Sequence, residues 1–403
     1  MAFVLIAFCG CVHNPIWNGY GPWQSLPSDK TPFSQTVDDD RFADEGQQAL
    51  ETLKSHRETH GFPAITAAIA IDGAIVWTGA AGWADLDTKA PATRDTVLRI
   101  GSTSKAVTAT ALARLVDSGE MSLDAPLSDY SNEWPNKAWN DLTPRQLASH
   151  TAGIPGYENN GDRFGQVITL SGCRHYESVA ESLAIFDGSD LIYEPGTAFA
   201  YSSFDVNLLG AAMASSQAQP FLSVLDRLVF DPLGLVASGS ESDGNDWPEL
   251  AQFYQKDKDQ LRTWKPFDLS QRIPGGGLVS TSADLVRIGS SWMDPAFIST
   301  QTRETMWTPQ VLQNGEVNEQ SYAIGWRYYP DAKWPGDDSR ALPFAHHGGI
   351  SKGAMSWLVV YPDYQMSIAI NINTRIENYS DFNSLEGKIL VLFLERIEQL
   401  QEE

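Results

Sequence analysis

The sequence predicts a mixed α/β (α+β) protein in which an antiparallel sheet, flanked by helices, is built from both ends of the chain around a mainly helical insertion. Residues 64–85 hold two β-rich runs joined at Asp72-Gly73, which is a hairpin signal. Three further segments have strand character, and they lie at residues 322–330, 354–362 and 365–373. Helix-like segments fill the region between these two groups. This order indicates a single sheet assembled from the two termini.

The expected helices differ in how their apolar residues are arranged. Residues 104–119 are apolar on almost all sides and end at Gly119, a pattern typical of a buried helix. Helix-like pieces follow at residues 178–186 and 221–234. After a run of glycines, residues 275–293 lead into another helix, and a last helix is expected at 386–401.

These elements suggest where the chain divides. We expect residues 1–40 to form a leader followed by an extended arm, since this segment is rich in Pro, Gly, Ser and Asn. Residues 41–403 then form the folded domain. Within it, a sheet subdomain takes about 41–100 and 271–403, and a helical subdomain takes about 101–270.

The charge of the chain excludes one class of partner. Among 403 residues, 51 acids against 28 bases give a formal net charge of −23. A surface this negative repels phosphate backbones, so nucleic acid is not an expected partner. With three cysteines in the chain, two of them in the leader, neither a disulfide framework nor a zinc site is expected.

The amino terminus, MAFVLIAFCGCVHNP, is an apolar run that ends at Gly10 and Cys11. It looks like a truncated bacterial lipoprotein signal, although the basic residues that open such signals are missing and Lys30 is the first basic residue. We expect a protein of the cell envelope, periplasmic or tethered to the membrane through a lipidated Cys11. The alternative is a frayed apolar tail on a cytoplasmic protein.

The stretch RIGSTSKAVTA places Ser102 three residues before Lys105, on one face of a helix. Burial disfavours the charged form of lysine, so a desolvated Lys105 could accept the serine proton and make Ser102 a nucleophile without a histidine. The alternative is a chance spacing, with Ser102 as a helix cap and Lys105 in solvent. A solvated lysine fits poorly at the start of so apolar a helix.

Neighbouring motifs carry a family resemblance. LRIGSTSK, LASHTAGIPGY, YEPGTAFAYSSFDVNLLG, GGGLVSTSADLVRIG and HHGGISKG occur in the order found in serine β-lactamase-like hydrolases. The chain therefore resembles the family of class C β-lactamases, penicillin-binding proteins and related esterases, over roughly residues 42 to 400. In detail, SHTAGI and YSSF look most like bacterial relatives of the mitochondrial serine β-lactamase-like protein. The resemblance implies a β-lactamase/transpeptidase-like fold.

The resemblance also implies roles for individual residues. Ser102 would be acylated, Lys105 would accept its proton, and Tyr201 would relay a proton to the leaving group. Ser203 stands where many members have asparagine. The substrate-binding strand matches His347, Gly348 and Gly349, although a register with His346 in place of His347 stays open. The backbone N–H groups of Ser102 and Ile350 would form the oxyanion hole.

His347 bears on the substrate, because penicillin-type enzymes commonly carry lysine at this position. A neutral histidine would hold a substrate carboxylate weakly, which favours an esterase or peptidase over a β-lactamase or D-alanyl-D-alanine carboxypeptidase. The alternative for His347 is simple strand packing, and for Tyr201 a core aromatic. His150 is expected to hold a loop through its ring nitrogens.

The resulting prediction is a serine hydrolase that cleaves ester or amide bonds of small molecules or peptides through an acyl-enzyme. It implies neither a metal nor a diffusible cofactor, and no obligate protein partner is identifiable. The alternatives are a non-catalytic binding or scaffold protein on the same fold, and a metal-dependent hydrolase. Residues 349–353 also spell Gly-x-Ser-x-Gly, the nucleophile elbow of α/β-hydrolases. That interpretation fails, because a strand-like segment follows Ser351 and no histidine lies beyond His347.

Overall fold

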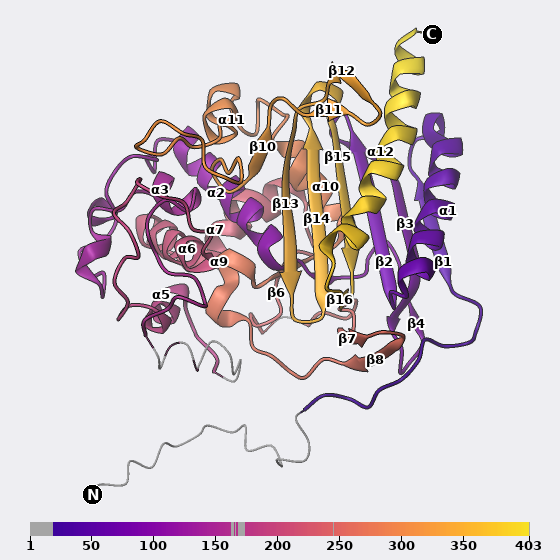
Figure 1. The fold of residues 1–403 in the computed structure, drawn as a ribbon, viewed down its shortest axis with the longest axis horizontal. Coiled ribbons are helices and arrows are strands. Elements are labelled where there is room, and N and C mark those ends of the chain that lie inside the picture. The colour runs from indigo at the N-terminus through magenta and orange to yellow at the C-terminus, as the bar shows by residue number, and fades with distance from the viewer. Residues whose placement is uncertain (1–18, 163–164, 166, 168–173, 245, 403) are drawn as a thin grey trace, which may run out of the picture.

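The protein is described by a computed structural model, which covers residues 19–162, 165, 167, 174–244 and 246–402. Its main sheet is antiparallel, in the order β1-β3-β2-β15-β14-β13-β10, with β4 paired to β3 (Figure 1). The strands of this sheet are β1 (Phe33–Val37), β2 (Ala64–Ile71), β3 (Ala74–Asp85), β4 (Ala90–Pro91), β10 (Arg327–Tyr329), β13 (Phe344–Ser351), β14 (Ala354–Tyr361) and β15 (Met366–Ile372).

Three small sheets accompany the main one. Their strands, sheet by sheet, are β5 (Leu98–Arg99), β9 (Leu278–Ser280) and β6 (Gly239–Ser240); β16 (Thr374–Arg375), β7 (Tyr254–Asp257) and β8 (Gln260–Thr263); β11 (Lys333–Trp334) and β12 (Asp337–Ala341).

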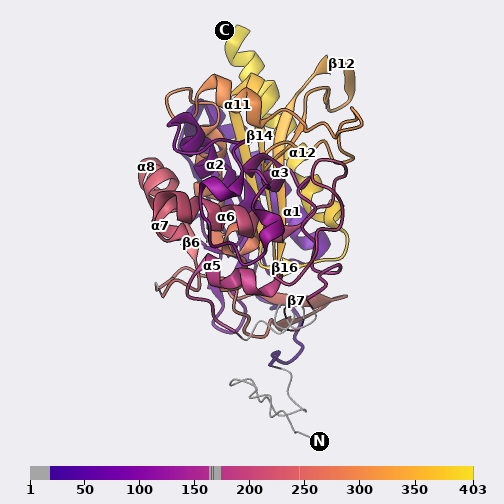
Figure 2. The ribbon, with the colours of Figure 1, turned by 90° about the vertical axis from the view of Figure 1, so that its left-hand side faces the viewer.

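Helices cover both faces of the main sheet. On one face lie α1 (Ala43–His60) and α12 (Tyr379–Glu402), which also pack on each other. The other face carries α10 (Ser282–Ser291), and beyond it the helical part of the chain, which Figures 1 and 2 show gathered on that side. Its helices are α2 (Ser104–Asp117), α3 (Pro144–Ala148), α5 (Val179–Ser182), α6 (Ser203–Gln217), α7 (Phe221–Leu225), α8 (Asp231–Leu233), α9 (Ile273–Gly276) and α11 (Thr300–Met306).

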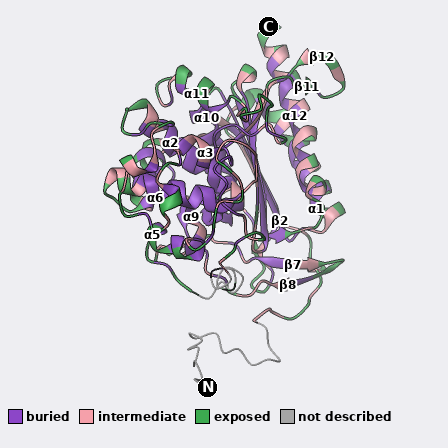
Figure 3. Cartoon of the chain, turned by 60° about the vertical axis from the view of Figure 1, so that its left-hand side comes forward, coloured by how far each residue is buried: buried purple, intermediate pink, exposed green. Residues whose placement is uncertain are grey.

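The sheet therefore separates two apolar layers. Along β2, Ile69 and Ile71 pack toward α1 and α12, whereas Ala68 and Ala70 face the helical part. Every residue of β2 is buried, and Figure 3 shows the central strands buried between exposed outer helix faces. A strand with two covered faces has no side exposed to water, which is why this segment is apolar apart from Thr66, whose hydroxyl is hydrogen-bonded to that of Ser282.

The predicted fold class is confirmed, and so are several predicted elements. The hairpin turns at Asp72 and Gly73, whose φ angles of 52° and 78° are both positive, as a two-residue type I′ turn requires. Helix α2 fills the predicted 104–119 segment, and Gly119 follows it with φ 73°.

Other boundaries differ from expectation. Within the segment expected as a strand at 322–330, only the three residues of β10 join the sheet as a strand. Helix α12 begins at Tyr379, seven residues before the expected start at 386. Strand β1 lies in the segment expected to be an arm, and it pairs with β3 along the edge of the sheet.

The leader with Cys11, as well as Cys173, lies outside the described residues, so the lipid anchor stays a prediction. Among the helices of the described part of the chain, none is long and apolar enough to cross a membrane.

One contact between the two halves of the fold positions the site. The short 3₁₀ turn Gly101–Thr103 packs against β13. A Cβ atom added to Gly349 would lie 1.9 Å from the carbonyl oxygen of Ile100 and 2.9 Å from the backbone nitrogen of Thr103. Gly101, with φ 51°, would place a Cβ 2.6 Å from the Ile350 carbonyl. Glycine at both positions lets the two backbones touch.

Gly349→Ala is expected to destabilise the protein by about 1–3 kcal/mol, because the new methyl group meets backbone that cannot move aside. The measurement is the urea midpoint of unfolding. The matched control is Gly387→Ala in α12, where a Cβ meets nothing within 4 Å and alanine should stabilise the helix by about 0.5–1 kcal/mol. Equal midpoints for Gly349→Ala and wild type would contradict the close packing.

Candidate active site

Ser102 lies in the 3₁₀ turn that leads into α2. Its side chain is partly exposed, whereas Thr103, Ser104 and Lys105 are buried. The hydroxyl therefore faces outward from the apolar helix that carries the lysine. This is the arrangement a nucleophile needs, because a substrate can reach the oxygen while its base stays out of water.

Lys105 Nζ has three polar neighbours, and their chemistry fits a neutral amine. It lies 3.2 Å from Ser102 Oγ and 2.9 Å from Ser203 Oγ, and it donates a hydrogen bond to the Gly275 carbonyl. A neutral amine has two N–H donors and one lone pair. The two donors can serve Gly275 and Ser203, and the lone pair then accepts the Ser102 hydroxyl proton.

Burial accounts for the neutral form. The Lys105 side chain is 1% exposed, and burial is the main reason why its pKa falls from 10.5 to about 7. Among nearby charges, Arg327 and Arg272 lower this pKa further, whereas Tyr157 and Asp205 act in the opposite direction. At neutral pH a large fraction of Lys105 is thus able to accept a proton.

Tyr201 completes the cluster. Its hydroxyl shares a hydrogen bond with the Ser102 side chain, and Lys105 Nζ lies 4.9 Å from the centre of its ring. Burial raises the pKa of Tyr201 to about 12, so at pH 7 only about one molecule in 10⁵ carries a tyrosinate. Lys105, half neutral at the same pH, is the far more available proton acceptor, and Tyr201 is a proton donor.

A buried His150–Asp205 pair packs behind Tyr201. The His150 ring lies 4.4 Å from the Tyr201 ring and 4.6 Å from the Tyr322 ring. His150 Nδ1 is 2.9 Å from Asp205 Oδ2. Burial lowers the pKa of His150, which is therefore neutral near pH 7, and raises the pKa of Asp205. The His150 ring packs on Tyr201, and its Nδ1 contacts Asp205 and the Ser202 N–H. The expected role of holding a loop through its ring nitrogens stays a prediction.

The position where many family members have asparagine is occupied by Ser203, which bonds Lys105. Its neighbour Ser202 caps α6, because Ser202 Oγ accepts a hydrogen bond from the Phe204 N–H and donates one to the Pro155 carbonyl. The cap fixes the first turn of α6 and therefore the position of the Ser203 hydroxyl relative to Lys105 Nζ.

The two histidines of β13 face opposite sides of the sheet. The ring of His347 lies 6.5 Å from that of Tyr201. The ring of His346 lies 4.4 Å from Trp357 instead. His347 Nδ1 is 2.8 Å from the Gly348 carbonyl, which can only accept, so Nδ1 carries the proton and Nε2 accepts from the Tyr322 hydroxyl at 2.9 Å. Burial keeps the pKa of His347 well below its usual value.

His347 is thus neutral, 0% exposed, and engaged at both ring nitrogens. It contacts the tyrosines of the site rather than the solvent from which substrate comes. The remaining residues of the predicted strand lie beside it. A Cβ on Gly348 would meet the Tyr379 hydroxyl at 2.3 Å, and the backbone of Ile350 lies against Gly101 while its side chain is 44% exposed.

Sequence reasoning missed Arg327 and the Gly275 carbonyl. Arg327, at the start of β10, pairs with His346 in the sheet register. Its guanidinium lies 5.4 Å from the Tyr201 ring and 5.0 Å from the Tyr322 ring, and it donates to Gln320. No motif marks an arginine on a neighbouring strand, and a carbonyl acceptor carries no side-chain signal at all.

The Gly-x-Ser-x-Gly at 349–353 is not a nucleophile elbow, as expected. Ser351 ends β13, and β14 follows after a two-residue turn where an elbow needs a helix.

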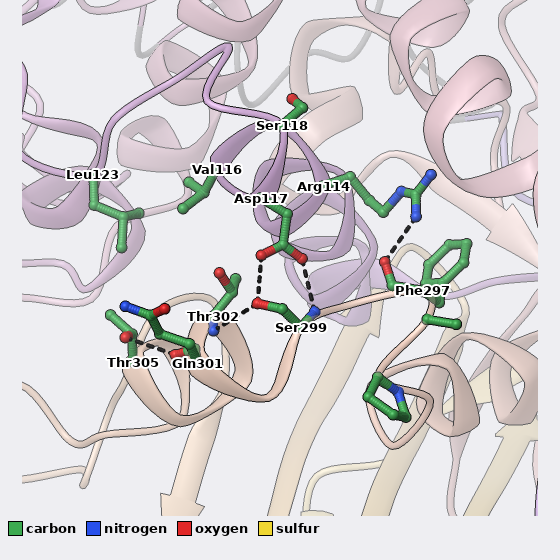
Figure 4. A pocket seen from close by; sticks show the side chains of 12 residues that line it. Arg114, Val116, Asp117, Ser118, Leu123, Phe297, Ser299, Gln301, Thr302 and Thr305 are labelled. Atoms are coloured by element: carbon green, nitrogen blue, oxygen red, sulfur yellow. Dashed lines mark hydrogen bonds between the residues drawn. The ribbon is translucent and has the colours of Figure 1, made fainter.

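A hollow of about 670 Å³ lies at the other end of α2, between α2 and the segment that leads into α11 (Figure 4). Asp117 lines it, but its carboxylate accepts hydrogen bonds from the N–H and the hydroxyl of Ser299. The Arg114 guanidinium bonds the Phe297 carbonyl. None of the sequence-predicted site residues lines this hollow.

Comparison with known protein families matches residues 46–386 to the family described as Beta-lactamase. The chain belongs to the beta-lactamase family. This confirms the resemblance drawn from the motifs, and the fold is accordingly the one shared by serine β-lactamases, esterases and penicillin-binding proteins.

Individual relatives point in more than one direction. The human mitochondrial serine beta-lactamase-like protein LACTB is 26% identical over 82% of this chain and 74% of its own. Esterase EstB of Burkholderia gladioli is 31% identical over 42% of this chain and 45% of its own. Among solved structures, the D-amino acid amidase of Ochrobactrum anthropi SV3 has a TM-score of 0.70 at 19% identity, covering 89% of this chain and 99% of that one.

Covalent labelling of Ser102 by a fluorophosphonate should depend on pH with a midpoint near 7. A protonated Lys105 cannot accept the serine proton, so the labelling rate falls as the pH drops below the lysine pKa of about 7. The rate is measured from pH 5 to 9.

Two variants sharpen this test. Arg327→Met removes a charge that lowers the Lys105 pKa, so its midpoint should move to higher pH. Lys333→Met, an exposed lysine on β11, should leave the midpoint in place. A rate that does not change between pH 5 and 9 would exclude Lys105 as the base.

Proposed function

We propose that this protein is a serine hydrolase that cleaves ester or amide bonds through an acyl-enzyme on Ser102. The observation that carries the proposal is the neutral amine of Lys105, whose lone pair is available to Ser102 Oγ at 3.2 Å. Burying a lysine costs free energy, so an apolar residue would serve a purely structural purpose better at this position. The buried amine beside a partly exposed hydroxyl therefore favours a chemical role.

The reaction follows from the protonation states. Lys105 takes the Ser102 proton as Oγ attacks the carbonyl carbon of the substrate. Tyr201, protonated and bonded to Ser102, passes a proton to the leaving group as the bond to the carbonyl carbon breaks. The N–H groups of Ser102 and Ile350 are proposed to stabilise the oxyanion, in line with the backbone contact between Gly101 and Ile350. Protonated Lys105 then returns a proton to Tyr201, which leaves the amine neutral again. Water attacks the acyl-enzyme carbonyl, Lys105 takes the proton of the water, and Ser102 Oγ regains a proton as its bond to the acyl group breaks.

Substrate preference is proposed to depend on Arg327 more than on His347. The sequence argument gave His347 the place of a carboxylate-binding lysine, but its ring is buried and its two nitrogens are occupied. The guanidinium near Tyr201 is the positive charge on that side of the site. Because the neutral, buried His347 offers no charge to a substrate carboxylate, we favour esters and peptide-like amides. Arg327, which can attract such a carboxylate, keeps β-lactams and D-alanyl peptides as the second candidate.

The similarity to an esterase supports the first candidate, and the similarity to β-lactamases supports the second. A non-catalytic role on the same fold is disfavoured by the intact set of Ser102, Lys105 and Tyr201. That alternative is one of the outcomes of the test below.

Ser102→Ala should abolish fluorophosphonate labelling and lower the hydrolysis of p-nitrophenyl esters to the uncatalysed rate, because the residue supplies the only oxygen that is proposed to form the acyl bond. A panel of p-nitrophenyl esters, D- and L-peptides and penicillins is assayed with both proteins. Matched turnover in the variant would rule out the nucleophile, and the absence of any turnover by wild type would favour a binding role.

Tyr201→Phe should lower kcat by about 10² to 10⁴, the usual contribution of a proton donor, and should leave the pH midpoint near 7, since Lys105 remains. A loss of less than a few-fold would mean that protons reach the leaving group by another route. A loss of the pH dependence itself would assign the base to Tyr201.

A further inference from the structure

A second group of cations lies around the carboxyl end of β13, beyond Ser351. It comprises Lys352 in the turn between β13 and β14, Arg272 just before α9, Lys265 after β8, and Arg375 in β16. We call these four residues the Lys352 cluster. In Figure 1 the β13–β14 turn lies at the lower end of the sheet, close to β16 and β7.

One aromatic ring brings two members of the cluster together. Lys352 Nζ lies 4.7 Å from the centre of the Phe267 ring, and the Arg272 guanidinium lies 5.6 Å from the same centre. Arg272 also lies 4.9 Å from the Tyr157 ring. Phe267 is buried, so it holds the two cations in fixed positions.

The cluster adjoins the turn that carries the nucleophile. A Cβ added to Gly276 would lie 3.9 Å from Arg272 Cδ and 3.7 Å from the Gly101 carbonyl carbon. From the other side, Arg99 donates a hydrogen bond of 2.7 Å to the Lys352 carbonyl. Arg272 is moreover one of the charges that lower the pKa of Lys105.

Acids do not offset these charges. The neighbouring Arg99 is neutralised by Glu241, but in the described part of the chain none of the four cluster residues forms a salt bridge. Arg272 Nε is buried without a hydrogen-bond partner there. Burial, and after it the cluster's other cations and Arg99, lower the pKa of Lys352 to about 8.

This grouping is unexpected in a chain with a net charge of −23. Cations that repel one another and are partly out of water cost free energy unless an anion joins them. The cluster lies next to Ser102, so the anion that joins it is expected to belong to the substrate. The order of groups along β13 indicates which part of the substrate carries it. Along β13, Arg327 pairs with His346 and the Tyr201 ring lies beside His347. The turn that carries Ser102 packs against Gly349 and Ile350, and Lys352 follows two residues later.

We propose that the Lys352 cluster binds an anionic group, a carboxylate or a phosphate, on the acyl part of the substrate. The proposal rests on the proposed function, in which Tyr201 protonates the leaving group and so places it toward His347. The acyl part then extends the other way. Lys352 is five residues beyond His347, or about 16 Å along an extended strand, which leaves room for the leaving group on one side of Ser102 and a short acyl chain on the other.

The test compares two esters of equal length, p-nitrophenyl hydrogen succinate and p-nitrophenyl butyrate. Wild type should favour the anionic ester in kcat/KM by about tenfold or more. Lys352→Met keeps the packing on Phe267 and should lower this ratio about tenfold, and Lys352→Glu should lower it further. Lys333→Met, a lysine outside the cluster, should leave the ratio unchanged. An equal ratio in wild type and Lys352→Met overturns the proposal.

A second measurement separates this proposal from the proposed function. Calorimetry with succinate and with inorganic phosphate is carried out on Ser102→Ala and on the Ser102→Ala/Lys352→Met double variant, neither of which needs to turn over. Weaker binding of one anion by the double variant supports the cluster and identifies carboxylate or phosphate as its ligand. If wild type hydrolyses neither ester, the proposed function fails. If, in addition, each anion binds equally well to the single and the double variant, the proposal that the Lys352 cluster binds an anion is overturned as well.

Discussion

The burial of Lys105 is the constraint on which the rest of the site depends. A lysine that is 1% exposed must either find a carboxylate or lose its proton. The acid whose charge reaches it is Asp205, which raises the pKa of Lys105, but burial outweighs this effect and lowers the lysine pKa to about 7. About half of the Lys105 side chains are therefore neutral at pH 7. The neutral amine needs one more proton, and Ser102 is the partner that can give it.

The proposed proton transfer requires Ser102 to be held in a fixed position relative to both the main sheet and the buried helix α2. Strand β10 pairs with β13 only as far as His346, which leaves the edge of β13 beyond it open. The turn Gly101–Thr103 packs on this open edge, where glycine at 101 and 349 lets backbone meet backbone. Ser102 is thus positioned by main-chain contacts between a sheet strand and the turn that begins a buried helix, and neither can shift without disturbing the core.

The sequence predicted the parts that depend on local spacing. Ser102 and Lys105 share a helix face, Asp72-Gly73 fits its turn, and the ordered motifs point to Tyr201 and His347. It did not predict α1, whose segment is too polar to show a clear apolar face, and it gave His347 a substrate contact that burial prevents. Arg327, Gly275 and Lys352 reach the site only through strand pairing and chain crossing, and such contacts have no signature in consecutive residues.

The charges around Ser102 work together in a way that the net charge conceals. Salt screens the electrostatic effect of the surface acids beyond about 8 Å at physiological ionic strength. Partly buried cations are screened less, because the effective dielectric constant between them is lower. Arg272 and Arg327 both lower the pKa of Lys105. An anion bound to either arginine cancels part of that effect, which raises the basicity of the amine only when substrate is in place. With the site empty, about half of the Lys105 side chains are deprotonated at pH 7, and under the proposed function a bound anion would strengthen the hold of the amine on the serine proton. Under the proposed function, the charge of the substrate and the proton affinity of Lys105 would therefore be coupled through the same two arginines.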